Sequence, residues 1–168
     1  EFDVDDENIL VELRQNDVNF TLTGADEVKR ALQNPIGTER LSGIVKPGEK
    51  VAIVTSDITR PMPSKIVLPL ILEELREAGV SYGDITVVFA LGSHRKHTEE
   101  EKKYLVGEDV YNKVQCIDSD PADFVHLGVT SRGTPVDIFS VVAKADRRIC
   151  LGNIEYHYFA GYSGGAKA

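Results

Sequence analysis

Val51-Ala52-Ile53-Val54-Thr55-Ser56-Asp57-Ile58-Thr59-Arg60-Pro61 is the stretch of sequence on which the fold class depends. Its first four residues are apolar without alternation, which is typical of a strand buried on both faces of a parallel sheet. From Pro63 to Ala78 the apolar residues recur near helical spacing, and Gly79 ends the pattern. The segment therefore predicts a strand, a polar loop and a helix in succession.

The same unit repeats further along the chain. The apolar run from Ile85 to Leu91 enters Gly92-Ser93-His94-Arg95-Lys96-His97-Thr98, and Thr98-Glu99-Glu100-Glu101 is a capping-box pattern that opens a helix. Further short strands are expected at 114–118, 124–129, 135–139 and 148–151, with a hairpin turn at Ser131-Arg132-Gly133.

The residues before the first of these strands are expected to be scaffold. Residues 9 to 22 alternate loosely between apolar and polar types around Asn16-Asp17, which predicts an antiparallel β-hairpin at the sheet edge. A short helix follows and ends at Asn34-Pro35. The whole pattern predicts a single α/β domain over residues 1–168: a mainly parallel, Rossmann-like sheet with helices on both faces and the hairpin at its edge.

Composition narrows the class of protein. The chain has 168 residues, 42% of them hydrophobic, which is enough to bury one sizeable core. Its net charge of -8 leaves no basic stripe for nucleic acid, and no apolar run approaches the roughly 20 residues that span a bilayer. Cys116 and Cys150 lie in apolar stretches outside any C-x-x-C pair, which is typical of buried, reduced thiols. We therefore expect a cytoplasmic protein that binds neither nucleic acid nor a membrane.

Ligands of open α/β sheets bind beyond the carboxyl ends of the strands. Three polar segments punctuated by Gly or Pro follow predicted strands here, at 55–61, 92–98 and 152–167. We expect them to converge on one rim.

In the first segment, a rigid backbone before Pro61 can aim the planar cation of Arg60 at a carboxylate or phosphate. Equally, Asp57 can cap a helix while Arg60 forms a surface ion pair. The residues of this segment alone leave the two interpretations open.

The second segment holds two histidines, His94 and His97, whose spacing of three is compatible with half a metal site, although no third ligand is apparent nearby. His94 comes directly after an apolar strand, where the backbone must surface, and we favour a functional role for it. His97 is placed nearer the solvent-facing start of a helix, and a structural role is preferred. A structural role is also preferred for His126, inside a short apolar strand.

The third segment, from Gly152 to Lys167, combines small residues that let a backbone approach a ligand with aromatic residues that can wall it. Gly161, Gly164 and Gly165 can cradle an anion with backbone N–H groups, yet the spacing matches neither a Walker loop nor the dinucleotide fingerprint. Lys167 can hold a phosphate, form a covalent adduct or be merely exposed, and its chemistry alone leaves these open.

Three segments occur in this order along the chain: Ser56-Asp57-Ile58-Thr59-Arg60-Pro61, Leu91-Gly92-Ser93-His94-Arg95, and Tyr156-His157-Tyr158-Phe159-Ala160-Gly161-Tyr162-Ser163-Gly164-Gly165-Ala166-Lys167. Together they resemble the N-terminal domain of nickel-dependent lactate racemase and its 2-hydroxyacid racemase and epimerase relatives. The resemblance covers essentially the whole chain. The last segment is specific, because His157 and Lys167 stand ten residues apart as in that family.

The resemblance implies a cofactor and a set of site residues. The cofactor is a nickel pincer nucleotide, a pyridinium-based mononucleotide tethered through a thioamide to a lysine, which matches Lys167. Two histidine acid/bases match His94 and His157, and Asp57 and Arg60 match positions that organise the substrate. The family's nickel-ligating histidine lies beyond the tethering lysine, and so beyond Ala168. No metal ligand is therefore assigned in this chain, and we expect residues 1–168 to lack the family's C-terminal domain.

The activity implied by the resemblance is racemisation or epimerisation of lactate or a related 2-hydroxycarboxylate. A histidine takes the hydroxyl proton while the cofactor accepts hydride, which is later returned to either face. The isolated chain is expected to be inactive and without the cofactor because it is incomplete. Two other hypotheses stay open: a non-catalytic cofactor-binding fragment, and a lyase that forms a Schiff base through Lys167.

Overall fold

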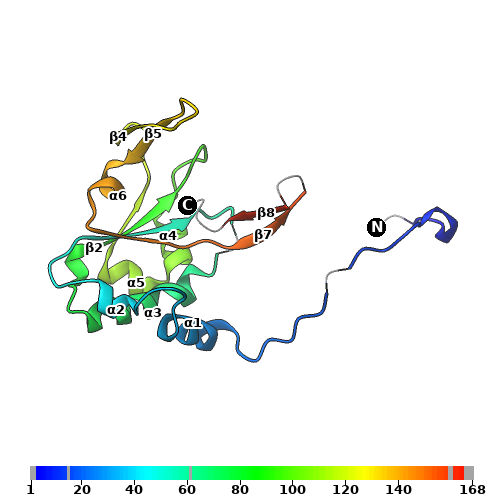
Figure 1. Ribbon diagram of the computed structural model, residues 1–168, viewed down its shortest axis with the longest axis horizontal. Helices are drawn as coiled ribbons and strands as arrows, with labels where there is room; N and C mark the ends of the chain where they lie inside the picture. Colours follow the sequence, from blue (N-terminus) through cyan, green and yellow to red (C-terminus); the bar gives the residue numbers. More distant parts are fainter. Residues whose placement is uncertain (1–2, 15, 61, 159–160, 165–168) are drawn as a thin grey trace.

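The computed structural model describes residues 3–14, 16–60, 62–158 and 161–164. These residues form a four-stranded parallel sheet, helices packed on it, and two separate antiparallel hairpins (Figure 1). The elements are η1 (Asp6–Asn8), α1 (Gly24–Gln33), α2 (Leu41–Ile44), β1 (Val51–Ser56), α3 (Ser64–Glu77), η2 (Tyr82–Asp84), β2 (Ile85–Ala90), α4 (Glu99–Val106), α5 (Glu108–Lys113), β3 (Gln115–Asp118), β4 (Phe124–Val129), β5 (Pro135–Phe139), α6 (Ser140–Lys144), β6 (Arg147–Cys150), β7 (Ile154–His157) and β8 (Gly161–Gly164).

The strand order β3-β2-β1-β6 puts β1 inside the sheet. Val51 aligns with Ile85 of β2 and with Arg147 of β6, so the parallel strands begin at one edge and end at the other. From β1 the chain moves outward to β2 and β3, and right-handed crossovers place α3, α4 and α5 on one face. It then returns past β1 to β6, and the reversed direction places α6 on the opposite face (Figure 1). The predicted α/β sheet with helices on both faces is confirmed.

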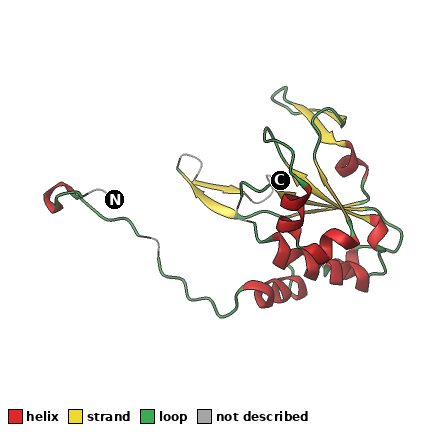
Figure 2. Ribbon diagram, turned by 180° about the vertical axis from the view of Figure 1, so that it is seen from behind, coloured by secondary structure: helices red, strands yellow, loops and turns green. Residues whose placement is uncertain are grey.

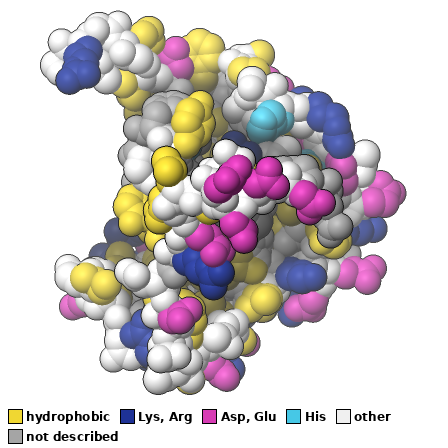
Figure 3. Space-filling model, turned by 90° about the vertical axis from the view of Figure 1, so that its right-hand side faces the viewer, with side chains coloured by type: hydrophobic (Ala, Val, Ile, Leu, Met, Phe, Trp, Pro, Cys, Tyr) yellow, Lys and Arg dark blue, Asp and Glu magenta, His cyan; other side chains and the backbone are white. Residues whose placement is uncertain are grey.

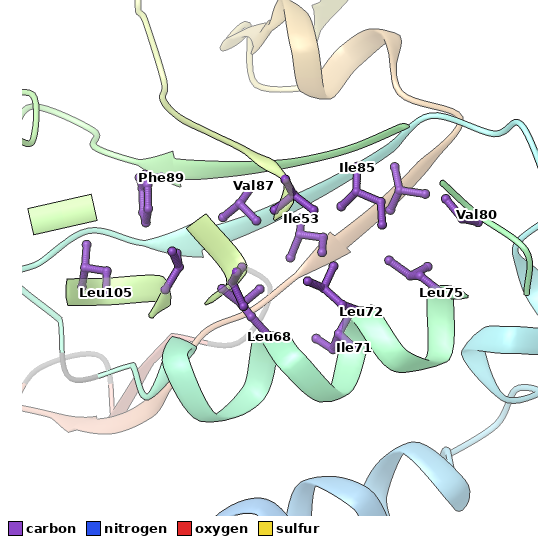
Figure 4. Packing of buried hydrophobic residues seen from close by; sticks show 14 of the residues in the cluster. Ile53, Leu68, Ile71, Leu72, Leu75, Val80, Ile85, Val87, Phe89 and Leu105 are labelled. Atoms are coloured by element: carbon purple, nitrogen blue, oxygen red, sulfur yellow. The ribbon is translucent and has the colours of Figure 1, made fainter. Parts of the chain in front are cut away.

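The hydrophobic core lies between the sheet and α3. Ile53 and Val87 point from the strands toward Leu68 and Leu72 of the helix (Figure 4), and each of these side chains is at most 3% exposed. Burying one such side chain contributes about 1.5–3 kcal/mol. Five of the six residues of β1 are buried, as the unbroken apolar run predicts. The core therefore fixes the strand from which the first polar loop emerges.

The helix signals in the sequence are also confirmed. The predicted short helix is α1, and the helix predicted from Pro63 to Ala78 is α3. At the start of α4 the Thr98 side chain accepts a hydrogen bond from Glu101 N–H, while the Glu101 carboxylate accepts one from Thr98 N–H. This capping box sets where the second polar loop ends.

The antiparallel hairpin predicted at residues 9 to 22 is wrong. The described residues of this segment form no strand and run as an extended chain away from the sheet (Figure 2). Its large apolar side chains are exposed: Ile9, Leu10, Val11, Leu13, Val18, Phe20 and Leu22. Antiparallel hairpins do occur in the fold, but they are β4–β5, as predicted, and β7–β8.

The two cysteines differ from the expectation that both are buried. Cys150 is exposed, and Cys116 is half-buried, where burial raises the pKa of its thiol to about 12. Acidic side chains gather near the middle of the face seen in Figure 3, while Lys and Arg side chains are scattered over it. Among the described residues, no helix is both long and apolar enough to cross a membrane.

Candidate functional site

Four strand ends meet at the carboxyl edge of the sheet. The loop from Asp57 follows β1, the loop from Leu91 follows β2, Asp118 ends β3, and Leu151 follows β6. Leu151 N–H donates to Val54 O at 2.8 Å, which keeps the chain beyond β6 beside β1. The three predicted segments thus leave the same edge of the sheet, next to the point where the connections reverse direction between β1 and β6.

Asp57 is the buried acidic group of this edge, with 3% of its surface exposed. Its Oδ1 accepts hydrogen bonds from Thr59 Oγ1 at 2.7 Å and from Thr59 N–H at 3.2 Å, and its Oδ2 pairs with His94 Nδ1. Burial by itself would raise the pKa of Asp57, but the hydrogen bonds from Thr59 and His94 outweigh it and hold the pKa below its usual value. Asp57 is therefore a carboxylate.

The loop after β1 has its own internal support. Arg60 N–H donates to Asp57 O at 3.1 Å and closes a turn. Below it, the Thr55 and Ser64 hydroxyls are hydrogen-bonded at 2.8 Å and join the end of β1 to the start of α3. The Asp57 carboxylate is thus presented by a closed turn rather than by an open loop.

Arg60 is exposed, and its Nη1 donates to Thr59 Oγ1 at 3.2 Å. Across the described residues, no carboxylate lies within ion-pair distance of its guanidinium. Asp57 caps no helix, because α3 begins after Pro63 without a side-chain cap. The alternative of a helix cap and a surface ion pair is therefore wrong for this part of the chain. The guanidinium remains available for a planar anion.

His94 stands in a tight turn after β2. Its N–H donates to Leu91 O at 3.0 Å, and the turn needs the positive φ of +58° at Gly92. The side chain is 43% exposed, and Nδ1–H donates to Asp57 Oδ2. This pairing fixes the tautomer of the neutral ring, because the proton on Nδ1 leaves Nε2 as the hydrogen-bond acceptor. A carboxylate-oriented imidazole of this kind can take a proton from a hydroxyl group.

His97 does not lie at a solvent-facing position, which corrects the expectation for it. It is 8% exposed, with Nδ1 2.6 Å from Asp118 Oδ1 and Nε2 3.1 Å from Ile58 N. The two histidines of this segment are therefore bound to different carboxylates, and nothing in their contacts supports half a metal site. Within the described ranges, no group of three or more potential metal ligands gathers.

The segment after β6, expected as a glycine-rich loop, forms the hairpin β7–β8 in its described part. His157 aligns with Gly161, and Tyr156 aligns with Tyr162, with ring centroids 5.3 Å apart. Side chains alternate across the hairpin, so the half-buried His157 lies on the face opposite to the exposed Tyr156. The His157 ring stacks on Tyr158 at 5.1 Å.

The glycines expected to cradle an anion have a more local role where they are described. Gly161 has a φ of +80° in the hairpin turn. Gly164 has a φ of +93°, and a Cβ there would lie 1.6 Å from Asn153 O, so any other residue would collide with the backbone. Gly165 and Lys167 lie outside the described residues. The expected structural role of His126 fits its hydrogen bond to Asp137 across β4–β5.

Thr59 and Asp118 are parts of the site that the sequence did not single out. Thr59 links Arg60 to Asp57, and Asp118 holds His97. Asp118 had one available signal, since it is the last residue of a strand beside β2 and thus belongs to the same edge of the sheet. For the hydroxyl of Thr59, the sequence offered no signal except that this residue lies in the loop after β1.

Comparisons with known proteins agree with this architecture. The family model described as the lactate racemase N-terminal domain matches residues 1–168. Lactate racemase of Thermoanaerobacterium thermosaccharolyticum is 39% identical over 172 residues, which cover 99% of this chain and 40% of that protein. Lactate racemase of Lactiplantibacillus plantarum is 35% identical over 170 residues, covering 98% of this chain and 40% of that protein. The chain thus spans about 40% of the length of these relatives.

Solved structures show the same similarity. The lactate racemase apoprotein from Thermoanaerobacterium thermosaccharolyticum superimposes with a TM-score of 0.81 at 38% identity, over 96% of this chain and 38% of that one. A Thermotoga maritima protein superimposes with a TM-score of 0.61 at 19% identity, over 84% of this chain and 36% of that one, and shows the fold alone. Because the family model spans the whole chain and a relative at 39% identity matches 99% of it, the chain belongs to the lactate racemase N-terminal domain family.

Proposed function

We propose that this chain is the proton-transfer and cofactor-tethering domain of a racemase or epimerase of lactate or a related 2-hydroxycarboxylate. The observation that carries the proposal is the buried Asp57 carboxylate hydrogen-bonded to the accessible His94, beside Arg60, at the carboxyl edge of the sheet. Membership of the lactate racemase N-terminal domain family supports the same reaction.

Arg60 is suited to the carboxylate of such a substrate. Its guanidinium is always charged and presents two parallel N–H donors, and among the described residues its hydrogen bonds run from Nη1 to Thr59. A substrate carboxylate held there would lie on the same loop as Asp57. The substrate hydroxyl can then be placed near the imidazole of His94.

His94 is suited to take the hydroxyl proton on Nε2. Asp57 holds the ring in the required tautomer and stabilises the imidazolium that forms when the proton arrives. We assign the corresponding role for the opposite enantiomer to His157. A positioned acid or base contributes about 10²- to 10⁴-fold to the rate. Because the reaction runs through the same steps in reverse, the loss of either histidine should slow interconversion in both directions.

Removal of the proton alone does not invert the carbon atom, because the adjacent C–H bond must also be broken. A nickel pincer nucleotide tethered to Lys167 would supply a hydride acceptor for that step. The chemistry of the described residues is compatible with such a group. A hydride acceptor does not itself take up the hydroxyl proton or bind the substrate carboxylate, and His94 and Arg60 can perform these two tasks. The family's nickel-ligating histidine would come from the protein beyond Ala168.

In this proposal, residues 1–168 form one domain that carries the acid/base histidines and the tethering lysine. A C-terminal domain supplies the remaining parts of the active site. The chain spans about 40% of its relatives, so the reaction is proposed for the full-length protein, in the cytoplasm, and not for residues 1–168 alone. A non-catalytic, cofactor-binding role of the isolated chain is the second candidate, favoured by the same coverage.

Single substitutions in the cofactor-loaded full-length protein test the proposal. His94→Ala and His157→Ala should each lower lactate interconversion by about 10²- to 10⁴-fold. His126→Ala is the matched control, because His126 also donates to an aspartate but lies on β4 and should leave the rate unchanged. Near-wild-type interconversion in both directions by either variant would refute the assignment.

Intact-mass measurement separates the two candidates for residues 1–168. The chain is produced together with the cofactor-synthesis enzymes. The masses of the intact chain and of the peptide that contains Lys167 are then measured by mass spectrometry. An added mass on Lys167 without interconversion supports a cofactor-binding role of the isolated chain. An unmodified lysine in a full-length protein that still interconverts lactate would exclude Lys167 as the tether.

A further inference from the structure

His97 is buried where three neighbouring strands end. Only 1% of its side chain is exposed, and its ring lies edge-on to Phe89 of β2, with centroids 5.1 Å apart. One ring nitrogen contacts Ile58 in the loop after β1, and the other contacts Asp118 at the end of β3. The proposed reaction assigns no task to this histidine, although it touches the loop that carries Asp57.

Both ring nitrogens of His97 are committed to hydrogen bonds of defined direction. Ile58 N–H donates to Nε2 at 3.1 Å, so Nε2 carries no proton. The proton is therefore on Nδ1, which donates to Asp118 Oδ1 at 2.6 Å. Rotation of the ring or a change of tautomer would break at least one of these bonds. The side chain is fixed in one orientation.

Asp118 is itself held firmly enough to serve as an anchor. Its Oδ2 accepts a hydrogen bond from His97 N–H at 3.0 Å, and Lys102 Nζ of α4 lies 4.0 Å from the same oxygen. Only 6% of the Asp118 side chain is exposed. The His97 ring therefore holds the backbone of Ile58 at a fixed position relative to the end of β3.

Ile58 lies between the two residues that orient His94. Asp57 accepts the Nδ1–H of that histidine, and Thr59 donates to Asp57 through both its N–H and its hydroxyl. A displacement of the Ile58 backbone would move both neighbours relative to the imidazole. A misplacement of about 1 Å can cost on the order of 10²-fold in rate.

We propose that His97 is a positioning residue, which ties the Asp57 loop to Asp118 and so keeps Asp57 within hydrogen-bonding distance of His94. The tie is a property of the folded chain, whereas its value for catalysis rests on the function proposed above. His97 contacts neither Arg60 nor the ring of His94 among the interactions of the described residues.

Two substitutions separate its two hydrogen bonds. In His97→Gln the amide oxygen lies near the former Nε2 and can accept from Ile58 N–H, whereas in His97→Asn the amide nitrogen lies near Nδ1 and can only serve Asp118. NMR of residues 1–168 reports on His94, which neither variant alters. In His97→Gln the backbone N–H of residue 97 still donates to Asp118 Oδ2, so the connection to Asp118 persists and the variant should keep the hydrogen-bonded Nδ1–H resonance of His94. His97→Asn should lose it, with at least about tenfold faster exchange of the Ile58 amide.

The control is a histidine that donates to an aspartate elsewhere in the fold. His126 Nδ1 lies 2.6 Å from Asp137 Oδ1, as His97 lies from Asp118, but it belongs to the separate β4–β5 hairpin. His126→Asn should leave the His94 resonance intact. The proposal is overturned if His97→Asn gives a folded spectrum that keeps both the His94 resonance and slow exchange at Ile58.

A measurement on the unaltered chain decides the case if His97→Asn does not fold. A scalar coupling between the Ile58 amide nitrogen and His97 Nε2, with slow exchange of that amide, supports the tie. Rapid exchange without the coupling overturns it.

The full-length, cofactor-loaded enzyme distinguishes the positioning role from the proposed function. His97→Asn should lower kcat by up to about 10²-fold with little change in KM, and His97→Gln should recover most of the loss. Loss of the His94 resonance without loss of kcat would contradict the catalytic role of His94, while it would still support the tie between His97 and Ile58.

Discussion

Two histidine–aspartate pairs of similar geometry stand in very different surroundings. In the His94–Asp57 pair the carboxylate is 4% exposed, whereas in the His126–Asp137 pair it is 39% exposed. A buried carboxylate holds its partner in one orientation and interacts with it through a medium of low dielectric constant. An exposed carboxylate is screened by water and contributes little. A buried acid paired with an accessible imidazole marks His94 as the candidate base, because in the His97–Asp118 pair the acid is also buried but only 1% of the histidine side chain is exposed.

This difference predicts the outcome of neutralising each acid in the full-length, cofactor-loaded enzyme. Asp57→Asn removes the charge that stabilises a protonated His94, and kcat should fall by about 10²- to 10⁴-fold. Asp137→Asn is the matched change at the exposed pair and should leave kcat within about twofold of wild type, because exposed pairs are weak. Equal losses from the two substitutions would show that burial of Asp57 has no special role in the reaction.

The sequence predicted only part of this arrangement. Asp57 and His94 were expected at one rim because each follows an apolar run, and the parallel strands bring such positions together. His97 was assigned to the surface because it precedes a helix with three acidic residues in its first turn. Its burial depends on Asp118, which lies 21 residues further along the chain on the neighbouring strand. Local sequence carries no signal for such a contact.

At the scale of elements, Glu101 in the first turn of α4 holds the preceding polar loop, residues 92–98, against the start of that helix. Glu101 accepts hydrogen bonds from the Arg95 guanidinium and from Thr98 N–H. The hydrogen bonds from Arg95, followed by that from Thr98, lower the pKa of Glu101 from 4.5 to about 2. The folded chain therefore binds a proton at Glu101 less readily than the unfolded chain does.

The sign of the resulting pH dependence follows from linkage. Because the pKa is lowered on folding, the contribution of Glu101 to stability is present above pH 4.5 and is lost as the pH falls toward 2. Wild type should exceed Glu101→Gln in free energy of unfolding at neutral pH, and the difference should shrink below pH 4.5 in urea titrations. The same substitution in an Arg95→Ala background should show a weaker pH dependence. A difference that stays constant from pH 7 to pH 2.5 would contradict the assignment.

Three segments show how far hairpins can be predicted from sequence patterns: β4–β5, residues 9–22, and β7–β8. Strands β4 and β5 were predicted because a Gly-containing turn separates two β-prone runs that can pair with each other. Residues 9–22 alternate as well, yet alternation measures only how well a segment fits a half-buried sheet, and no described strand lies beside it. In β7–β8, glycines at the turn and at the close approach to Asn153 obscured the strand pattern.

At the scale of the whole molecule, the two neighbours of β1 differ in how far away they lie in sequence. β2 joins β1 through α3 and a connection of 28 residues, from Asp57 to Asp84, whereas β6 joins it only after the chain has formed β2 to β5. Because the cost of closing a loop rises with the logarithm of its length, pairing β6 directly with β1 costs about 1 kcal/mol more in chain entropy. We therefore expect β1, α3 and β2 to assemble first, and β6 to join late.

Ile53 and Ile149 provide a matched test, because they are paired in register on β1 and β6. Ile53 is fully buried against α3, and Ile149 packs partly buried at the border of the same core. Ile→Val at each position should cost about 0.5–1.5 kcal/mol. If β1 belongs to the early nucleus, Ile53→Val slows folding in stopped-flow measurements, while Ile149→Val mainly accelerates unfolding. The reverse pattern would mean that β6 pairs with β1 before the crossover helix is packed, and that the long connection does not determine the order of assembly.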